Sequence, residues 1–133
     1  MTFKLGPASI LRLQQVHPDL AKVVERAIVV SAIEFTVLEG ARTKERQDEL
    51  LAAGATTTLN SRHIPSSDGF ARAVDLGALV GGKVRWDWPL YFKIADAMKL
   101  AAKELGIPLE WGGDWKKFKD GPHFQLPHKE YPA

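Results

Sequence analysis

The sequence contains no cysteine among its 133 residues. This absence excludes disulfide bonds, thiolate metal sites and a cysteine nucleophile. Any metal site in this chain must therefore be built from histidine, aspartate or glutamate side chains. The lack of cysteine does not assign a compartment by itself, because such a chain can work in reducing or oxidising surroundings.

Long apolar runs are also missing. No window contains the roughly 18 apolar residues that a membrane span requires. The first residues, Met-Thr-Phe-Lys-Leu-Gly-Pro, lack the apolar centre of a signal peptide. We therefore expect a protein that is made in the cytoplasm, has no signal peptide and does not insert stably into a membrane.

The composition is that of a globular protein, with 45% hydrophobic and 26% charged residues. A chain of this length fits one domain, which we place at residues 1–133. Such a chain can bury roughly two-thirds of its unfolded surface and needs no covalent crosslink to fold.

The net charge of +2 is only mildly basic. Lys116, Lys117 and Lys119 cluster around Trp115 and Phe118, and such a cluster could contact nucleic acid or an anionic cell wall. A solvated loop is the simpler interpretation of this segment, so we predict no nucleic-acid partner.

Apolar periodicity and turn residues predict helices alternating with short strands. The expected helices cover residues 7–15, 18–30, 43–53 and 88–105, and the expected strands cover 34–38, 73–80, 83–86, 109–111 and 123–126. This order predicts an α+β fold, in which helices pack on one small antiparallel sheet.

Individual residues support these boundaries. Thr43 and Asp87 are suited to cap helices, and Gly54 to the left-handed position after one. Gly81-Gly82 predicts a tight hairpin turn. The apolar positions expected in the first helix are Ile10, Leu11 and Leu13, and those of the last are Leu90, Ile94, Ala97, Met98, Ala101 and Leu105.

Three polar residues occupy positions that a structural role does not explain well. His63 lies in Ser-Arg-His at the start of a long loop rich in Ser, Pro and Gly. Asp75 lies in Ala-Val-Asp-Leu, where strand alternation points it away from Val74 and Leu76. His123 lies in Asp-Gly-Pro-His-Phe-Gln-Leu and shares a strand face with Gln125.

Two imidazoles and one carboxylate are a typical ligand set for zinc, with a fourth position left for water. Each residue also has a structural explanation. His63 is explained as a surface or hydrogen-bonding group, Asp75 as a partner of backbone donors or Arg72, and His123 as a strand residue on a wet face. His17 and His128 are assigned to structural or surface roles.

A peptide-hydrolysing site also needs a general base. Asp120 precedes His123 by one Gly-Pro turn, which could bring its carboxylate near the site without making it a ligand. Its structural explanation is the turn itself, since Asp-Gly favours turns. Glu110 is the other candidate.

The segments Ser61-Arg62-His63, Ala73–Leu76 and Asp120–Phe124 resemble, in combination, the three zinc-site segments of the VanY-type metallopeptidases. This group includes D-Ala-D-Ala carboxypeptidases and phage endolysins that are L-alanyl-D-glutamate peptidases. The resemblance covers about residues 40–126 and implies a D-Ala-D-Ala peptidase-like fold. The short chain is most similar to the endolysin branch.

The resemblance implies a role for each residue. His63, Asp75 and His123 would bind zinc, and Asp120 would be the general base. Arg42, Gln47 and Ser61 would lie on the substrate side, with the forked donors of Arg42 suited to a carboxylate or carbonyl of the stem peptide.

The chain departs from the usual family pattern between the first histidine and the aspartate. The interval from His63 to Asp75 is longer, because a Pro-Ser-Ser-Asp-Gly segment is inserted. Asp68 in this insert is an alternative ligand, and Asp75 is preferred for its strand context. Aspartate rather than glutamate as the base is similar to the endolysin branch.

The resulting hypothesis is a monomeric zinc endopeptidase that cuts the L-Ala–D-Glu bond of peptidoglycan stem peptides during host lysis. It would stay in the host cytoplasm until a membrane-permeabilising protein releases it to the wall. The alternatives are a D,D-carboxypeptidase or dipeptidase with the same site, and a wall-binding module with a structural zinc ion.

Overall fold

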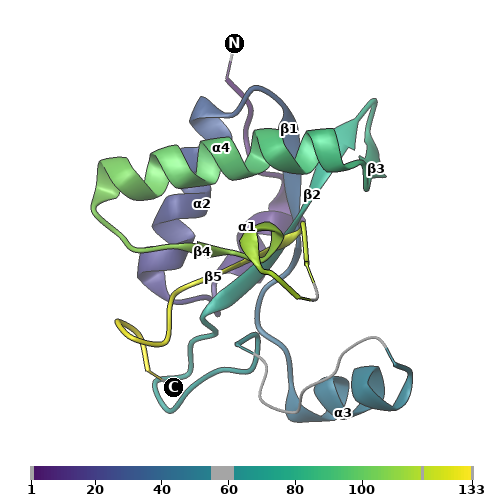
Figure 1. The fold of residues 1–133 in the computed structure, drawn as a ribbon, viewed down its shortest axis with the longest axis vertical. Helices are drawn as coiled ribbons and strands as arrows, with labels where there is room; N and C mark the ends of the chain where they lie inside the picture. Colours follow the sequence, from purple (N-terminus) through teal and green to yellow (C-terminus); the bar gives the residue numbers. More distant parts are fainter. Residues whose placement is uncertain (1, 55–61, 118, 133) are drawn as a thin grey trace.

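The structure is a computed structural model that describes residues 2–54, 62–117 and 119–132. These residues form an antiparallel sheet with α-helices packed around it (Figure 1). The helices are α1 (Pro7–Leu13), α2 (Pro18–Val30), α3 (Lys44–Ala52) and α4 (Trp88–Leu105), with a 3-10 turn η1 (Gly112–Asp114). The strands are β1 (Glu34–Glu39), β2 (Ala73–Val80), β3 (Lys83–Arg85), β4 (Glu110–Trp111) and β5 (His123–Gln125).

Strand β2 is the centre of the sheet, whose order is β1-β2-β5-β4. One edge of β2 pairs with β1, and the other pairs with β5 and then with β3 further along. The C-terminal strand is thereby inserted between β2 and β4. The register of this pairing places Asp75 directly opposite His123.

The core lies on one face of the sheet. Val74, Leu76 and Ala78 alternate inward along β2 and are fully buried. Figure 1 shows α4 crossing in front of α2, while α3 lies apart from both at the lower edge of the view. The predicted stripe of α2 is buried, and its members are Leu20, Val23, Val24, Ala27 and Ile28. Asp75, between two inward residues, faces the opposite side of the sheet.

Most local predictions are confirmed, since α2 and α4 have the expected bounds. The Thr43 hydroxyl accepts a hydrogen bond from the backbone N–H of Arg46 and caps α3. The β2–β3 hairpin turns at Gly81 and Gly82, whose φ angles of 59° and 78° are readily adopted only by glycine. No helix in the described part of the chain is long and apolar enough to cross a membrane.

Several details differ from the sequence-based expectation. Of the apolar residues expected in the first helix, Leu13 is buried but Ile10 and Leu11 are exposed. The carboxylate of Asp87 pairs with Arg85 instead of capping α4. Leu105 is 42% exposed, because it lies in the last turn of α4, just before the chain turns at Gly106. Helix α1 ends at Leu13 and not at residue 15. Ser9 is also buried in this helix, where its hydroxyl group forms hydrogen bonds with β1.

The segment that leads into β2 is held by both ends of the chain. Ala71 forms a parallel bridge with Val16, just before α2. The Arg62 guanidinium donates to the backbone carbonyls of Leu126 at 2.6 Å and Tyr131 at 2.8 Å. These contacts place His63, the next residue, against the sheet.

Two leucines on neighbouring helices provide a test of the core. Leu20 is fully buried in α2, whereas Leu11 in α1 is 66% exposed. We expect Leu20→Ala to lower the free energy of unfolding by about 2–5 kcal/mol, because it removes buried apolar surface and leaves a cavity. Leu11→Ala is the matched control, with an expected change within about 0.5 kcal/mol. Urea denaturation of both variants measures the difference, and equal losses would contradict the assigned core.

Candidate metal centre

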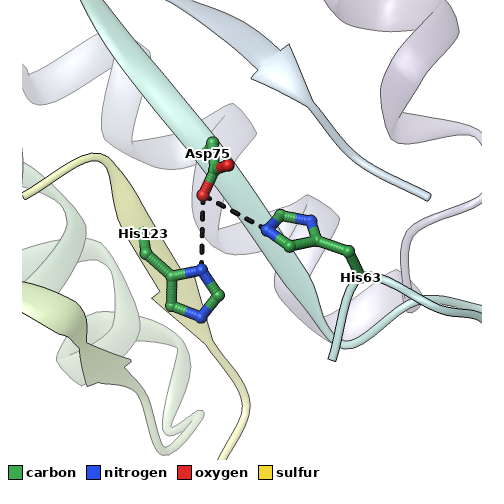
Figure 2. A group of neighbouring side chains, drawn as sticks. All are labelled: His63, Asp75 and His123. Carbon is green, nitrogen blue, oxygen red and sulfur yellow. Dashed lines mark hydrogen bonds and ion pairs between the residues drawn. The ribbon is translucent and has the colours of Figure 1, made fainter. Parts of the chain in front are cut away.

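Three side chains from separate segments meet on the polar face of the sheet (Figure 2). Asp75 comes from β2, His123 from β5, and His63 from the segment before β2. Oδ1 of Asp75 lies 3.2 Å from Nε2 of His63 and 3.3 Å from Nδ1 of His123. One potential ligand atom from each residue lies within 4.8 Å of the other two.

The remaining nitrogen of each imidazole already has a hydrogen-bond partner. Nδ1 of His63 lies 2.8 Å from the carbonyl oxygen of Gly40, and Nε2 of His123 lies 2.8 Å from Oε1 of Gln125. Both partners are acceptors, so these outer nitrogens carry the protons. The inner nitrogens, Nε2 of His63 and Nδ1 of His123, therefore point toward Asp75 and are available as ligands.

The two separations that join Asp75 to the imidazoles fit a tetrahedral metal ion. Zinc–nitrogen and zinc–oxygen bonds of about 2.0–2.1 Å imply neighbouring ligand atoms about 3.3 Å apart. The separations of 3.2 Å and 3.3 Å between Asp75 and the two imidazoles match this value. The site is also enclosed, since His63 is 2% and His123 is 7% exposed. A His-Asp-His group that can bind a metal is thus present, as predicted.

The charges of the group favour an ionised aspartate. Burial alone would raise the pKa of Asp75, but hydrogen bonds with His123 and His63 hold it well below the usual range. Burial is the largest single influence on His123 and lowers its pKa. The hydrogen bond and charge of Asp75, with smaller contributions from Gln125 and Asp120, together raise the pKa overall. The raised pKa of His123 favours a second proton on its inner nitrogen, between the ring and Asp75. A metal ion bound here would compete with that proton, so binding should weaken in acid.

Asp120 interacts electrostatically with all three residues of this group, and the Gly121-Pro122 turn that follows it leads into β5. Its backbone N–H donates to Gly112 at 3.0 Å, and its carbonyl accepts from His123 at 3.2 Å. A side chain on Gly112 would lie 2.3 Å from the Asp120 carbonyl oxygen, so this approach requires glycine. Burial and the negative charge of Asp75 raise the pKa of the Asp120 carboxyl group, which suits a proton acceptor.

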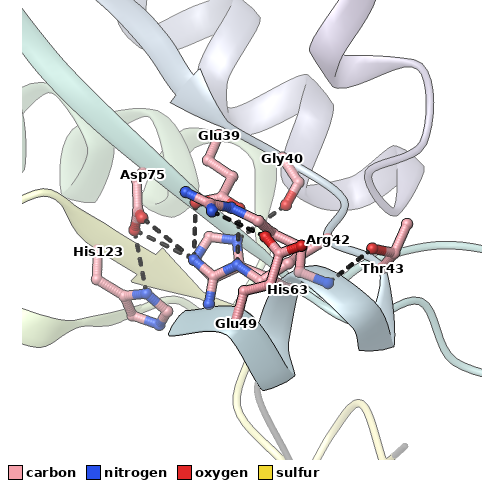
Figure 3. A network of polar contacts seen from close by, with 9 residues as sticks. Glu39, Gly40, Arg42, Thr43, Glu49, His63, Asp75 and His123 are labelled. Atoms are coloured by element: carbon pink, nitrogen blue, oxygen red, sulfur yellow. Dashed lines mark hydrogen bonds and ion pairs between the residues drawn. The ribbon is translucent and has the colours of Figure 1, made fainter. Parts of the chain in front are cut away.

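Arg42 lies next to the group, where Figure 3 shows it between Glu39 and Asp75. Its guanidinium donates to both carboxylate oxygens of Glu39, at 2.6 Å and 2.7 Å, and lies 4.0 Å from Oδ2 of Asp75. Its backbone N–H donates to the carbonyl of His63 at 2.7 Å. Arg42 therefore has an acidic partner, Glu39, as a structural role requires. It also lies next to the His-Asp-His group.

Gln47 and Ser61 are the other two substrate-side candidates. Gln47 belongs to α3, the helix that follows Arg42. Ser61 lies outside the described residues. Their assignment to substrate therefore stays a prediction.

The alternative candidates have other partners. Asp68 is paired with Arg72 through both carboxylate oxygens, at 3.1 Å and 3.0 Å, so Arg72 is engaged away from Asp75. This pairing and the backbone N–H of Phe70 lower the pKa of Asp68 to about 2. The carboxylate of Glu110 accepts hydrogen bonds from Gln125 at 3.1 Å and from Trp115 at 2.9 Å.

The remaining histidines and lysines lie elsewhere. Nδ1 of His17 accepts the backbone N–H of Asp19 and caps α2, and His128 is exposed. The lysine cluster of residues 116, 117 and 119 is exposed. None of these residues belongs to the His-Asp-His group.

Three contributors to the site were not identified from the sequence. They are Glu39, the carbonyl of Gly40, and Gln125. Gln125 was detectable in part, because strand alternation already placed it on the face of His123. Glu39 and Gly40 have no such signal, since their contacts depend on how the end of β1 meets the His63 segment.

Comparison with known proteins connects this geometry to a family. Residues 1–126 match the family model of the phage L-alanyl-D-glutamate peptidases. The chain belongs to this family. The predicted resemblance, the α+β fold and the peptidoglycan endopeptidase class are thereby confirmed at the level of the family.

Individual relatives include phage and bacterial proteins. The L-alanyl-D-glutamate peptidase of Escherichia phage T5 is 34% identical over 124 residues, which are 90% of this chain and 87% of the phage protein. The peptidoglycan L-alanyl-D-glutamate endopeptidase CwlK of Bacillus subtilis is 30% identical, over 83% of this chain and 72% of CwlK. The crystal structure of the Serratia marcescens L-Ala D-Glu endopeptidase ChiX superposes with a TM-score of 0.88 at 46% identity, covering 97% of this chain and 94% of ChiX.

Proposed function

We propose that this protein is a zinc-dependent endopeptidase that hydrolyses the L-Ala–D-Glu bond of peptidoglycan stem peptides, with His63, Asp75 and His123 as its zinc ligands. The observation that carries the proposal is the convergence of one ligand atom from each of three residues, all within 4.8 Å of one another. Family membership supports the substrate. In this proposal the protein acts as a monomer in host lysis and reaches the wall only after the membrane has been opened.

The donor set favours zinc among the common metals. Two imidazole nitrogens and one carboxylate oxygen suit a small ion of borderline softness in a tetrahedral site. Magnesium and calcium prefer six or more oxygen ligands, which this group does not offer. The three ligands leave one position for a reacting group, as in catalytic zinc sites.

The chain's own residues can perform the proton transfers that hydrolysis needs. Asp120 accepts a proton from the attacking water, whose oxygen adds to the L-Ala carbonyl carbon. The same carboxyl group then gives the proton to the D-Glu nitrogen as the C–N bond breaks. When bound, zinc supplies the Lewis acidity that activates the water and polarises the scissile carbonyl. Gly40 and Gln125 keep the two imidazoles in fixed orientations throughout.

Arg42 is assigned to the substrate in the same proposal. We expect Arg42→Lys to raise KM for a stem peptide about 10-fold or more, because a lysine cannot make two parallel hydrogen bonds to a carboxylate. The zinc affinity should stay within about threefold, since Arg42 is not a ligand. Steady-state kinetics and zinc titration measure the two quantities, and an unchanged KM would assign Arg42 to Glu39 alone.

Analysis of digested wall tests the bond that is cut. Purified peptidoglycan is incubated with the zinc-loaded protein, and the products are identified by mass spectrometry. Peptides with a new N-terminal D-Glu, together with L-Ala retained on the glycan, are the expected products. Released D-alanine would instead indicate the D,D-carboxypeptidase or dipeptidase alternative, and wall binding without fragments would indicate a binding module.

A further inference from the structure

Gln125 orients the His123 imidazole in the mechanism above, and it is itself held by neighbouring residues. Gln125 follows His123 by two positions in β5, so both side chains lie on the same face of the strand. Gln125 is only 6% exposed, and its Oε1 lies 2.8 Å from Nε2 of His123. The orientation of this amide therefore determines which nitrogen of His123 carries the proton.

A buried glutamine amide can present either its oxygen or its NH2 group, and here Glu110 distinguishes the two. Glu110 lies directly across from Gln125 in the β4–β5 pairing. Its Oε2 accepts a hydrogen bond from Nε2 of Gln125 at 3.1 Å. A carboxylate offers only acceptors, so the NH2 group must face Glu110 and the oxygen must face His123.

Glu110 is held in place by an aromatic residue. Nε1 of Trp115 donates to the same Oε2 atom at 2.9 Å. The Trp115 ring also lies against the His123 ring, with centroids 5.1 Å apart. The N–H groups of Trp115 and Gln125 therefore both donate to Glu110. The Trp115 ring also packs against the His123 imidazole.

We propose that Glu110 and Gln125 are positioning residues that hold His123 in the tautomer whose Nδ1 lone pair faces the metal. If the amide were reversed, its NH2 group would donate to Nε2 of His123, and the proton would move to Nδ1, the ligand atom. The inference rests on the proposed zinc site and assigns Glu110 to ligand orientation in place of general base catalysis.

The test measures zinc affinity in three variants. Gln125→Met keeps the side-chain length and removes the acceptor, and we expect a loss of about 10- to 100-fold, the usual effect of removing a group that orients a ligand. Glu110→Ala should weaken binding in the same direction by a smaller factor. The double variant should bind no more weakly than Gln125→Met alone, because Glu110 acts through Gln125. Competition with a chromophoric chelator gives the dissociation constants.

A second measurement separates orientation from general loosening. Long-range 1H–15N spectra of the metal-free protein, recorded at a pH where His123 is neutral, report which imidazole nitrogen is protonated. The wild-type protein should show His123 protonated at Nε2, and Glu110→Ala should show broadened or mixed His123 signals with His63 unchanged. Glu104→Gln, which alters the exposed Arg26–Glu104 pair, is the control and should change neither readout.

The outcomes distinguish this inference from the zinc proposal. If the wild-type protein binds no zinc, the proposed function fails. If it binds zinc and both folded single variants bind equally tightly, the positioning role is wrong. If the loss of zinc affinity in the double variant equals the product of the losses in the two single variants, Glu110 acts independently of Gln125. The proposal that Glu110 acts through Gln125 is then wrong. Should Gln125→Met fail to fold, Glu110→Ala and its His123 spectrum decide the question.

Discussion

Asp120→Asn is expected to reduce hydrolysis of the L-Ala–D-Glu bond by about 10²- to 10⁴-fold, the usual contribution of a general base. Asparagine has nearly the same shape as aspartate but cannot accept the proton of the attacking water. Zinc content should not change, because Asp120 does not belong to the ligand group. Fragment release and elemental analysis on the same preparation measure both quantities. Substantial wall digestion by this variant would contradict the proposed mechanism.

The pKa of Asp120 predicts an independent signature of the same role. Its folded-state pKa is raised, so the ionised form is less favourable in the folded than in the unfolded protein. The carboxyl group thus costs stability once the pH exceeds its unfolded pKa, and this cost is absent below that value. The metal-free Asp120→Asn variant should therefore be at least as stable as the wild type at neutral pH. A clearly lower melting temperature would instead assign Asp120 to the structure of its turn.

Asp75→Asn is expected to weaken zinc binding by more than about 100-fold, beyond the range for residues that only orient a ligand. The change removes the charge and one anionic oxygen from the ligand set, with little change in side-chain volume. Hydrolysis should be lost in parallel. Zinc titration and wall digestion test both expectations.

Asp68→Asn is the matched control for that experiment. Both aspartates follow His63, and both are candidate ligands from the sequence pattern. The structure pairs Asp68 with Arg72 and leaves it outside the metal group, so this variant should keep its zinc and its activity. Loss of zinc in Asp68→Asn with retention in Asp75→Asn would reverse the ligand assignment.

Local features of the chain were predictable because their causes are local. The apolar spacing of α2 and α4 and the glycines at the hairpin turn depend on residues a few positions apart. Asp87 shows where this reasoning fails. Its position before α4 is that of a cap, but its carboxylate pairs with Arg85. The Asp87 carboxylate can bond either to the first turn of α4 or to Arg85, and the sequence does not indicate which bond is more stable.

The sequence by itself determined the family, the α+β class, the absence of thiol chemistry and the candidates His63, Asp75, His123 and Asp120. Only the tertiary structure decided that the three ligand candidates meet, because this depends on the β2–β5 register and on the anchoring of the His63 segment. The same holds for the partners that orient them. Gly40 and Glu110 are distant in sequence from the histidines they influence, and such contacts arise only when strands pair and loops close.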